Sequence, residues 1–342
     1  MLTARYLSQA GQKVTLIDKS DTGKESSWAG GGIVSPLYPW RYKDSITALA
    51  QYGQQHYPDI CAELLEDTGI DPEYRNSGLL MLAPEEEPEA LQWANRFNYQ
   101  LESVSPIDIN SIEPGMKVTD KTGLWMKSIG QVRNPRIVKA LRANIEKRGV
   151  NILTDSEVTG FEIDGNKVTA VTTKDQKLTS DQYAVCTGAW TAELLKPLDL
   201  ELAIEPIQGQ MILFKAEPDN IHRIVLEEDR YVIPRKDGRV VFGSTLENVG
   251  FEKHTTETAR NELHELAVER FPVLKDKTIE HHWAGLRPGT PEGVPVISQH
   301  PELDNLFINA GHFRNGVVLA PGSCKLMSEL LLNDKTSFEH AN

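Results

Sequence analysis

The sequence of 342 residues contains little cysteine and no long hydrophobic run. Its three cysteines, Cys61, Cys186 and Cys324, are widely spaced and form no C-x-x-C pair. This usage argues against a disulfide framework or a zinc site and fits a reducing cytosol. We interpret Cys186, which lies in an apolar run, as a small buried hydrophobic residue. No apolar segment approaches the roughly 20 residues that a membrane-spanning helix needs, so we expect a cytoplasmic protein without stable membrane insertion.

Positive charge is also scarce. The chain has 36 Lys and Arg residues against 49 Asp and Glu residues, which gives a formal net charge of -13. This balance would repel a nucleic-acid backbone, so we expect no nucleic-acid partner. The sequence also lacks a G-x-S-x-G elbow, a Walker loop and a His-x-x-x-His pair. His281 and His282 are adjacent and would point to opposite faces of a strand, so we predict no metal site.

The N-terminus lacks a Gly-rich turn where one would be expected. The first 18 residues resemble the second half of a βαβ nucleotide-binding unit, with a helix that ends at Gly11, a strand from Val14 to Ile17, and Asp18 at its tip. In such units the acidic residue follows the Gly-rich turn by about twenty residues and binds a ribose hydroxyl. We therefore expect the first strand and the phosphate-binding glycines to lie upstream of Met1, which would be an internal methionine of a longer protein.

The rest of the chain alternates between two patterns. Helical periodicity covers residues 45–69, 135–148 and 256–271, and Pro321 to Leu332 is expected to form a last helix. Short strands dominate from Pro206 onward. Because α/β segments occupy both ends and the middle, the pattern predicts a discontinuous nucleotide domain and an inserted α+β substrate domain. The predicted bounds are residues 1–40, 131–205 and 281–342 for the first, and residues 41–130 and 206–280 for the second.

Two arginines stand in Gly-rich motifs of the C-terminal third. Arg287 lies in the rigid Gly/Pro frame Trp283–Thr290, and Arg314 lies in the turn Gly311–Gly316. A guanidinium matches a carboxylate and stays charged away from water, so the pair suits a small anionic substrate. Each arginine could instead be a surface ion-pair partner. Tyr231 could donate a hydrogen bond to a bound carboxylate, or it could be an ordinary core tyrosine.

Five segments together carry a specific resemblance. They are Glu25–Arg41, Asn134–Arg136, Gln208–Phe214, Trp283–Thr290 and Gly311–Pro321. These segments resemble the glycine-oxidase branch, associated with thiamine biosynthesis, of the D-amino-acid oxidase family of FAD-dependent oxidoreductases. The resemblance extends over essentially the whole chain, and the last two motifs are long and specific. The chain departs from the family in having no counterpart of its G-x-G-x-x-G motif and first strand, which puts FAD affinity in question.

The resemblance implies a fold, a cofactor and a set of roles. The fold would be an α/β FAD-binding Rossmann-like domain, N-terminally truncated, with an α+β substrate domain built on an antiparallel sheet. FAD would be bound non-covalently, because Cys324 lies beyond the turn that follows the flavin. Arg287 would bind the substrate carboxylate, assisted by Tyr231 and Arg314. The implied cofactor-binding residues are Asp18, Lys19, Ser26, Ser27, Gly30, Gly31, Gly32, Val158, Gly188, His312, Phe313, Arg314, Asn315, Gly316, Val317 and Val318.

The implied reaction is the oxidation of glycine, or of another small amino acid, by O₂ to glyoxylate, ammonia and hydrogen peroxide, in supply of the thiamine thiazole pathway. The family also suggests a homotetramer. One alternative is an amine or D-amino-acid dehydrogenase that uses another electron acceptor. A second is a catalytically inactive fragment, since loss of a central strand exposes sheet edges and removes an anion-binding turn. An oxidase domain of tRNA modification is disfavoured by the acidic charge. The ranking of glycine, sarcosine and small D-amino acids stays open.

Overall fold

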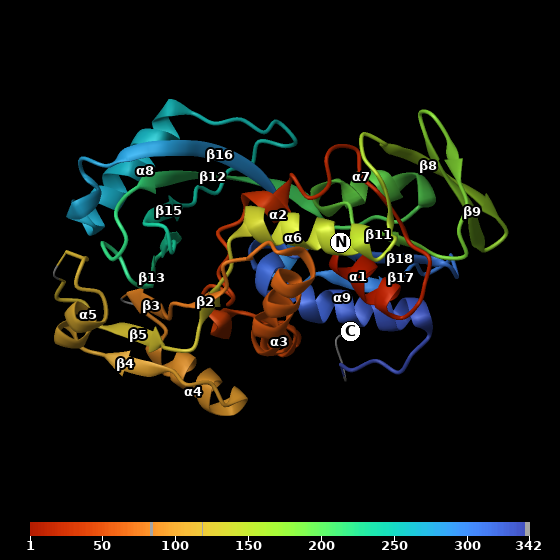
Figure 1. Cartoon of the computed structure of the whole chain (residues 1–342). Coiled ribbons are helices and arrows are strands. Elements are labelled where there is room, and N and C mark those ends of the chain that lie inside the picture. The colour runs from red at the N-terminus through yellow and green to blue at the C-terminus, as the bar shows by residue number, and fades with distance from the viewer. Residues whose placement is uncertain (83–84, 118, 339–342) are drawn as a thin grey trace.

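A large mixed sheet forms one end of the molecule (Figure 1). The computed structural model describes residues 1–82, 85–117 and 119–338. Neighbouring strands of the sheet are antiparallel except for the parallel pair β3 and β13. In spatial order the strands are β16 (Thr278–Gly289), β12 (Glu205–Lys215), β15 (Arg239–Gly243), β14 (Arg230–Pro234), β13 (Ile224–Glu227), β3 (Leu79–Leu82), β5 (Gly123–Met126) and β4 (Glu102–Val104).

Smaller sheets and long helices form the other end (Figure 1). Parallel pairing joins β1 to β7 and β11 to β18, as expected of a nucleotide-binding domain. Strand β17 adds to β18 in antiparallel fashion, β8 to β10 form a separate antiparallel sheet, and β2 pairs with β6. The bounds are β1 Thr15–Ile17, β2 Arg75–Asn76, β6 Gly130–Gln131, β7 Asn151–Leu153, β8 Val158–Asp164, β9 Lys167–Thr173, β10 Lys177–Leu178, β11 Tyr183–Val185, β17 Val296–Gln299 and β18 Leu306–Ala310.

The helices follow the periodic segments of the sequence closely. The longest, α3, spans Asp44–Thr68, where residues 45–69 were expected. The α-helices are α1 Leu2–Gln9, α2 Ser26–Ala29, α3 Asp44–Thr68, α4 Glu87–Phe97, α5 Pro106–Ile112, α6 Asn134–Lys147, α7 Thr191–Leu195, α8 Glu257–Arg270 and α9 Gly316–Leu332. Short 3-10 turns are η1 Pro39–Arg41, η2 Gly188–Trp190, η3 Lys196–Leu198, η4 Pro272–Leu274, η5 Pro291–Gly293 and η6 Phe313–Asn315.

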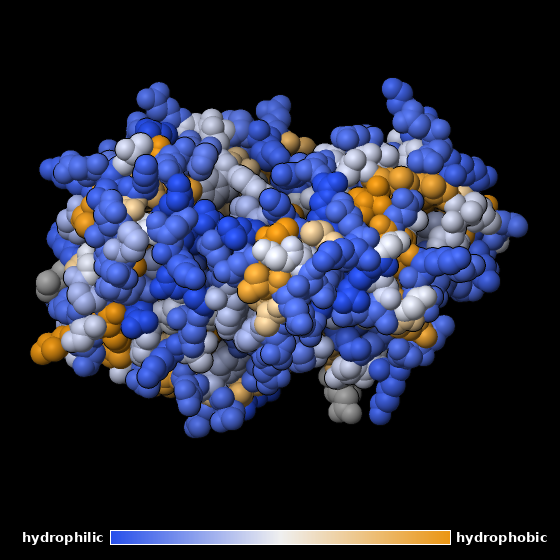
Figure 2. All heavy atoms as spheres, viewed as in Figure 1, coloured by the Kyte–Doolittle hydropathy of each residue, from blue (hydrophilic) through white to orange (hydrophobic). Residues whose placement is uncertain are grey.

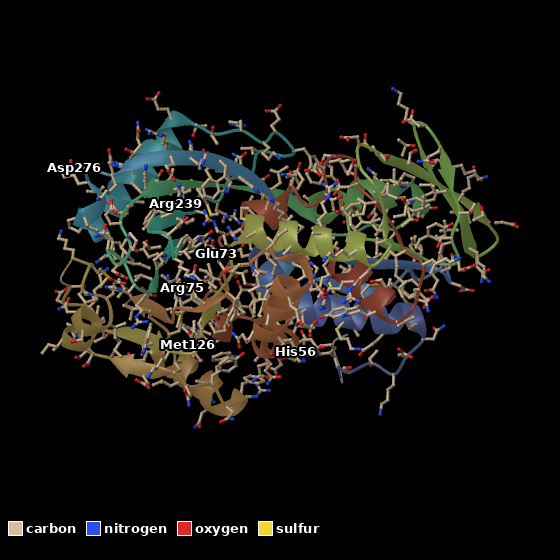
Figure 3. All side chains as sticks on the ribbon, viewed as in Figure 1. His56, Glu73, Arg75, Met126, Arg239 and Asp276 are labelled. Carbon is tan, nitrogen blue, oxygen red and sulfur yellow. The ribbon has the colours of Figure 1, made fainter. Side chains whose placement is uncertain are left out.

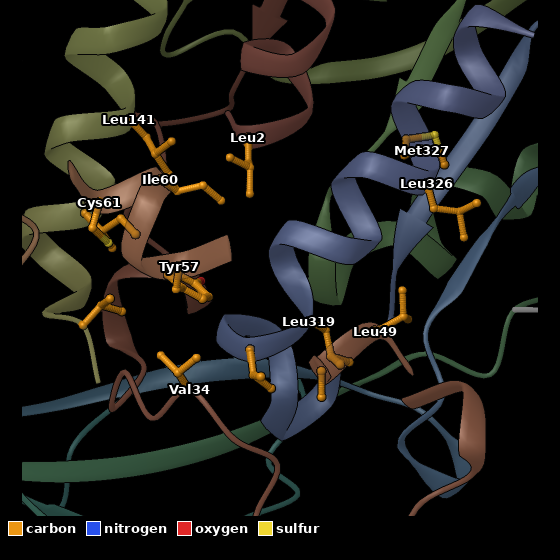
Figure 4. Close-up of a cluster of buried hydrophobic side chains, with 14 of the residues drawn as sticks. Leu2, Val34, Leu49, Tyr57, Ile60, Cys61, Leu141, Leu319, Leu326 and Met327 are labelled. Atoms are coloured by element: carbon orange, nitrogen blue, oxygen red, sulfur yellow. The ribbon is translucent and has the colours of Figure 1, made fainter. Parts of the chain in front are cut away.

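A hydrophobic cluster joins α1, α3, α6 and α9 (Figure 4). Leu49 and Tyr57 of α3 meet Leu319 and Leu326 of α9 there. Burying side chains of this size is worth about 1.5–3 kcal/mol each. The surface is mostly hydrophilic on the face shown in Figure 2, with small apolar patches. Among the described residues, no helix combines the length and the apolar character that crossing a bilayer requires.

The segment around Arg287, expected to be a rigid Gly/Pro frame, is part of a long strand. Residues 278–289 form one twelve-residue strand, β16, and Arg287 lies inside it. Pro288 cannot donate a ladder hydrogen bond, and proline is tolerated in sheets chiefly on edge strands. β16 is the edge strand of the large sheet, which is the position where a proline is tolerated.

The last helix also differs from the expectation. It begins at Gly316 rather than at Pro321, which lies inside it. Proline in a helix removes the hydrogen bond to the carbonyl four residues earlier. That carbonyl belongs to Val317, and it accepts a hydrogen bond of 2.6 Å from the hydroxyl of Tyr57 on α3. A partner 260 positions away in the chain therefore stabilises a helix start that local rules exclude.

This compensation makes a prediction for stability. Tyr57→Phe should lower the free energy of unfolding by about 1–2 kcal/mol, because the Val317 carbonyl is left without a donor. In a Pro321→Ala background the restored backbone N–H can serve that carbonyl, so the same substitution should cost less. Urea unfolding of the four proteins of this cycle measures the difference. An equal cost in both backgrounds would contradict the assignment.

Candidate active site

A cavity of about 1890 Å³ lies between the two ends of the molecule. Its walls include Asp18 beside β1, the glycine run after α2, strands β12 and β16 of the large sheet, and the turn before α9. Cys186 was expected to be buried, but it is exposed and lines this cavity. The apolar run Tyr183–Cys186 therefore packs only its alternate side chains, because successive strand residues point to opposite faces.

The glycine run is fixed to the large sheet by a buried arginine. Arg235, at the end of β14, donates to the Gly31 carbonyl at 2.7 Å and to the Val132 carbonyl at 3.0 Å. Gly32 has φ of 86°, and a Cβ there would lie 2.0 Å from the Val132 oxygen, so only glycine fits. Burial lowers the pKa of Arg235 to about 10, which leaves the guanidinium charged at neutral pH.

The nucleotide end of the cavity has polar groups that suit an adenosine moiety. The Asp18 carboxylate stands at the end of β1 and accepts from the backbone N–H of Ser20 at 3.0 Å. Lys19 lies 3.4 Å from the centre of the Trp190 ring. Beside the glycine run, Asn134 donates to the Ser27 carbonyl at 2.8 Å, while its buried side-chain oxygen has no hydrogen-bond partner among the described residues. An acceptor left unsatisfied at a cavity wall is consistent with a polar ligand there.

The cavity wall contains most of the cofactor residues implied by the motifs. Asn315 and Val318 are buried, 1% and 0% exposed, and do not line the cavity. The residues that do line it are Asp18, Lys19, Ser26, Ser27, Gly30, Gly31, Gly32, Val158, Gly188, His312, Phe313, Arg314, Gly316 and Val317. Residues from five separate parts of the sequence are thus brought to one surface.

Arg287 also lines the cavity and lies across β12. Its guanidinium donates to the Ser244 hydroxyl at 2.6 Å and to the Thr245 carbonyl at 3.4 Å. A Cβ on Gly209 would come within 2.1 Å of both terminal nitrogens, so the guanidinium lies directly over this glycine. In the part of the chain that the structure describes, both of these partners are neutral oxygens. Arg287 is therefore not the surface ion-pair residue that the sequence left open.

Charged and polar neighbours act on this guanidinium. Burial lowers the pKa of Arg287, and Arg314 lowers it further, whereas Tyr231 and Glu247 oppose the shift. Tyr231 is 8% exposed, lines the cavity, and donates to the Met211 sulfur at 3.1 Å. The three residues expected at the substrate end, Arg287, Tyr231 and Arg314, all line the cavity, and Tyr231 and Arg314 are near enough to Arg287 to act on its charge.

A polar network behind Arg287 was not expected from the sequence. Glu247 accepts from Gln208 at 3.1 Å, from Gln210 at 2.9 Å and from the Thr245 hydroxyl. Partial burial opposes ionisation of Glu247, but these hydrogen bonds outweigh it and hold its pKa below the ordinary value. The sequence pointed to this region only through the motif Gln208–Phe214. That motif lies beside Arg287 because β12 pairs with β16 and sets Ile207 opposite Arg287.

The short helix α2 is attached to the same strand. Ser26 donates to the Leu286 carbonyl, and Trp283 donates to the Ala29 carbonyl at 3.0 Å. Because α2 leads into the glycine run, β16 positions both the proposed substrate arginine and the loop at the middle of the cavity. This arrangement can hold an anionic small molecule beside a larger ligand that follows the cavity toward Asp18.

Comparisons with known proteins agree with this architecture. The family model "DAO: FAD dependent oxidoreductase" matches residues 1–330. The glycine oxidase of Pseudomonas aeruginosa is 45% identical over 332 residues, which are 97% of this chain and 91% of that protein. The glycine oxidase of Pseudomonas putida is 44% identical, with 97% and 91% covered. The bifunctional protein ThiO/ThiG of Synechocystis sp. is 31% identical over 97% of this chain, which spans 49% of that relative.

Solved structures show the same fold. The glycine oxidase of Geobacillus kaustophilus superposes with a TM-score of 0.94 at 24% identity, covering 99% of this chain and 93% of that one. The glycine oxidase of Bacillus cereus has a TM-score of 0.90 at 25% identity, with 98% and 95% covered. The α/β and α+β architecture predicted from the motifs is confirmed, and FAD is the cofactor. The chain therefore belongs to the D-amino-acid oxidase (DAO) family of FAD-dependent oxidoreductases.

Proposed function

We propose that this protein catalyses the oxidative deamination of glycine and other small amino acids, with O₂ as the electron acceptor and glyoxylate, ammonia and hydrogen peroxide as the products from glycine. The observation that carries the proposal is the Arg287 guanidinium, held at the cavity wall by the neutral oxygens of Ser244 and Thr245. Arginine at such a site pairs strongly with a carboxylate. The Pseudomonas relatives are glycine oxidases, which favours glycine as the substrate.

The proposal has four further parts. They are a role in supplying the thiamine thiazole pathway, FAD bound without a covalent bond, a cytoplasmic location and a homotetramer. The Synechocystis relative supports the first, since its name joins ThiO to ThiG in one protein. For the non-covalent binding of FAD, acid precipitation should release the flavin and leave a colourless protein.

The domain bounds stay a prediction. They are residues 1–40, 131–205 and 281–342 for the nucleotide domain, and residues 41–130 and 206–280 for the substrate domain.

The residues of this chain divide the work between binding and orientation. FAD supplies the two-electron acceptor when it is bound. Asp18, Lys19 and the glycine run would hold the cofactor, while Arg287 would bind the substrate carboxylate and the Tyr231 hydroxyl would donate a second hydrogen bond to it. Two fixed contacts on the carboxylate orient the α-carbon toward the cofactor. Such positioning can supply a large part of the rate enhancement where no side chain acts as an acid or base.

His312 contributes a neutral, oriented side chain to the same wall. Ser323 donates to the Asn309 side-chain oxygen at 2.7 Å, so its single proton is used there. The His312 Nε2 must therefore donate to the Ser323 hydroxyl, 2.7 Å away, and Nδ1 carries no proton. Burial lowers the pKa of His312 to about 4, so the ring stays neutral at physiological pH. The neutral His312 ring therefore adds no positive charge to the cavity wall next to Arg314.

The binding role of Arg287 is tested by two substitutions. Arg287→Ala should raise KM for glycine about 10- to 100-fold, because a charge-assisted contact is lost, while the flavin absorbance stays unchanged. Gly209→Ala should raise KM in the same direction, since its methyl group occupies the position of the guanidinium. Arg239→Ala is the matched control, because that arginine pairs with Glu280 on the outer part of the large sheet (Figure 3). Unaltered glycine kinetics in Arg287→Ala would reject the proposal.

The titration of His312 predicts a pH effect on stability. Its pKa is lower in the folded protein than in the unfolded chain, about 4 against roughly 6.5. The stability that it contributes is therefore complete above about pH 6.5 and is lost as the pH falls toward 4. The Tm of the wild type should fall more steeply between pH 7 and pH 4.5 than that of His312→Asn, compared at equal FAD loading. Parallel Tm curves would show that His312 is not the titrating group.

The electron acceptor is tested by product stoichiometry. An oxidase should form about one hydrogen peroxide for each glyoxylate in air-saturated buffer, because O₂ takes up both electrons. A dehydrogenase should form little peroxide and should need an added dye or quinone for turnover. Measuring both products in the same reaction separates these two activities. Protein that binds FAD but forms no 2-oxo acid from any small amino acid, with O₂ or with an added acceptor, would support the inactive alternative.

A further inference from the structure

We propose that Asp229 is a specificity-determining residue, which pairs with Arg314 at the edge of the substrate region and thereby excludes amino acids that carry a second carboxylate. This inference rests on the proposed function, in which the first carboxylate binds Arg287. It adds a role for a residue outside the motifs considered so far, and it concerns which substrates the same site accepts.

The ion pair joins the two ends of the molecule. Arg314 lies in η6, on the turn between β18 and α9, whereas Asp229 lies in the turn between β13 and β14. The Arg314 Nη1 atom donates to the Asp229 carboxylate at 2.8 Å. The Arg314 side chain is 19% exposed and lines the cavity, and the Asp229 side chain is 59% exposed. The pair therefore lies where the substrate end of the cavity meets solvent.

The two arginines of this region differ in their partners. Arg287 is hydrogen-bonded by neutral oxygens, so its charge is available to a substrate anion. The charge of Arg314 is already compensated by a carboxylate. The turn η6 contacts strand β16, and both arginines line the cavity, so Arg314 lies near Arg287. The positive charge of Arg314 accordingly lowers the pKa of Arg287. One free positive charge matches one substrate carboxylate.

A second carboxylate on the substrate meets unfavourable conditions here. It would either lie near the negative charge of Asp229 or displace Asp229 from Arg314, and both cost binding free energy. Arg41 stacks on Tyr38 and is near enough to Asp229 for that carboxylate to raise its pKa. It offers no replacement, because both oxygens of the Glu86 carboxylate accept from it at 2.7 and 2.9 Å. The Asp229–Arg314 pair thus disfavours dicarboxylic substrates through charge repulsion rather than through the size of the cavity.

Asp229→Asn removes the charge and keeps an oxygen that can accept from Arg314. A dicarboxylic substrate could then bind one carboxylate to Arg287 and the other to Arg314. Iminodiacetate, which is glycine with a carboxymethyl group on its nitrogen, is the appropriate probe. Iminodiacetate, O₂ and water would give glyoxylate, glycine and hydrogen peroxide, so the carbon–nitrogen bond that breaks and the electrons that reach O₂ are those of the glycine reaction.

The experiment compares initial rates of glyoxylate formation from iminodiacetate and from glycine. In Asp229→Asn the ratio of the two kcat/KM values should rise about tenfold or more over the wild type. The rise should disappear in Asp229→Asn combined with Arg314→Gln, because the receiving arginine is then absent. Asp276→Asn is the matched control, since it removes an exposed carboxylate just before β16, at the end of the large sheet away from Arg287 (Figure 3), and should leave the ratio unchanged.

A second readout does not depend on turnover. The dissociation constants of malonate and acetate, measured by their perturbation of the flavin absorbance, should shift toward malonate in Asp229→Asn by a similar factor. A shift below threefold in both ratios, or a shift that persists without Arg314, would overturn the proposal. If the FAD-loaded wild type oxidises no small amino acid, the proposed function fails instead, and the malonate-to-acetate ratio still decides the role of Asp229.

Discussion

The pairing of β12 with β16 is the constraint on which the candidate site depends. This register sets Arg287 opposite Ile207 and brings its guanidinium over Gly209, where any side chain would collide with it. The same strand holds α2 through Ser26 and Trp283. One pair of strands therefore positions the proposed carboxylate-binding group relative to the glycine run. A shift of one residue would turn Arg287 to the other face of the sheet and separate the two.

Charge compensation determines what each arginine can do. Arg235 is buried and donates to the Gly31 and Val132 carbonyls and to the Gln131 side-chain oxygen, so it acts as a structural tie to the glycine run. Arg314 is neutralised by Asp229. Arg287, like Arg235, is held by neutral oxygens, but it lines the cavity at the proposed substrate end. The charge of the partner separates Arg314 from the other two arginines, and the place in the cavity separates Arg287 from Arg235.

Local sequence predicted the features that depend on local rules. Helical periodicity located α3, and the pattern before Asp18 located α1 and β1. The motifs predicted the family and the cofactor, which the comparisons confirm. Expectations failed where distant contacts decide the structure. The start of α9 depends on Tyr57, 260 positions from the carbonyl it binds, and strand β16 tolerates Pro288 because it is an edge strand. The pairing of Asp229 with Arg314, 85 positions apart, has no local sequence signal.

The most direct test of the account is a crystal structure of the FAD-loaded protein with acetate, a carboxylate that cannot be oxidised as an amino acid can. The account predicts the acetate oxygens within hydrogen-bond distance of the Arg287 guanidinium, on the side of the cavity bordered by Gly31 and Tyr231. Acetate bound elsewhere in the cavity, with the Arg287 guanidinium still held only by Ser244 and Thr245, would contradict it.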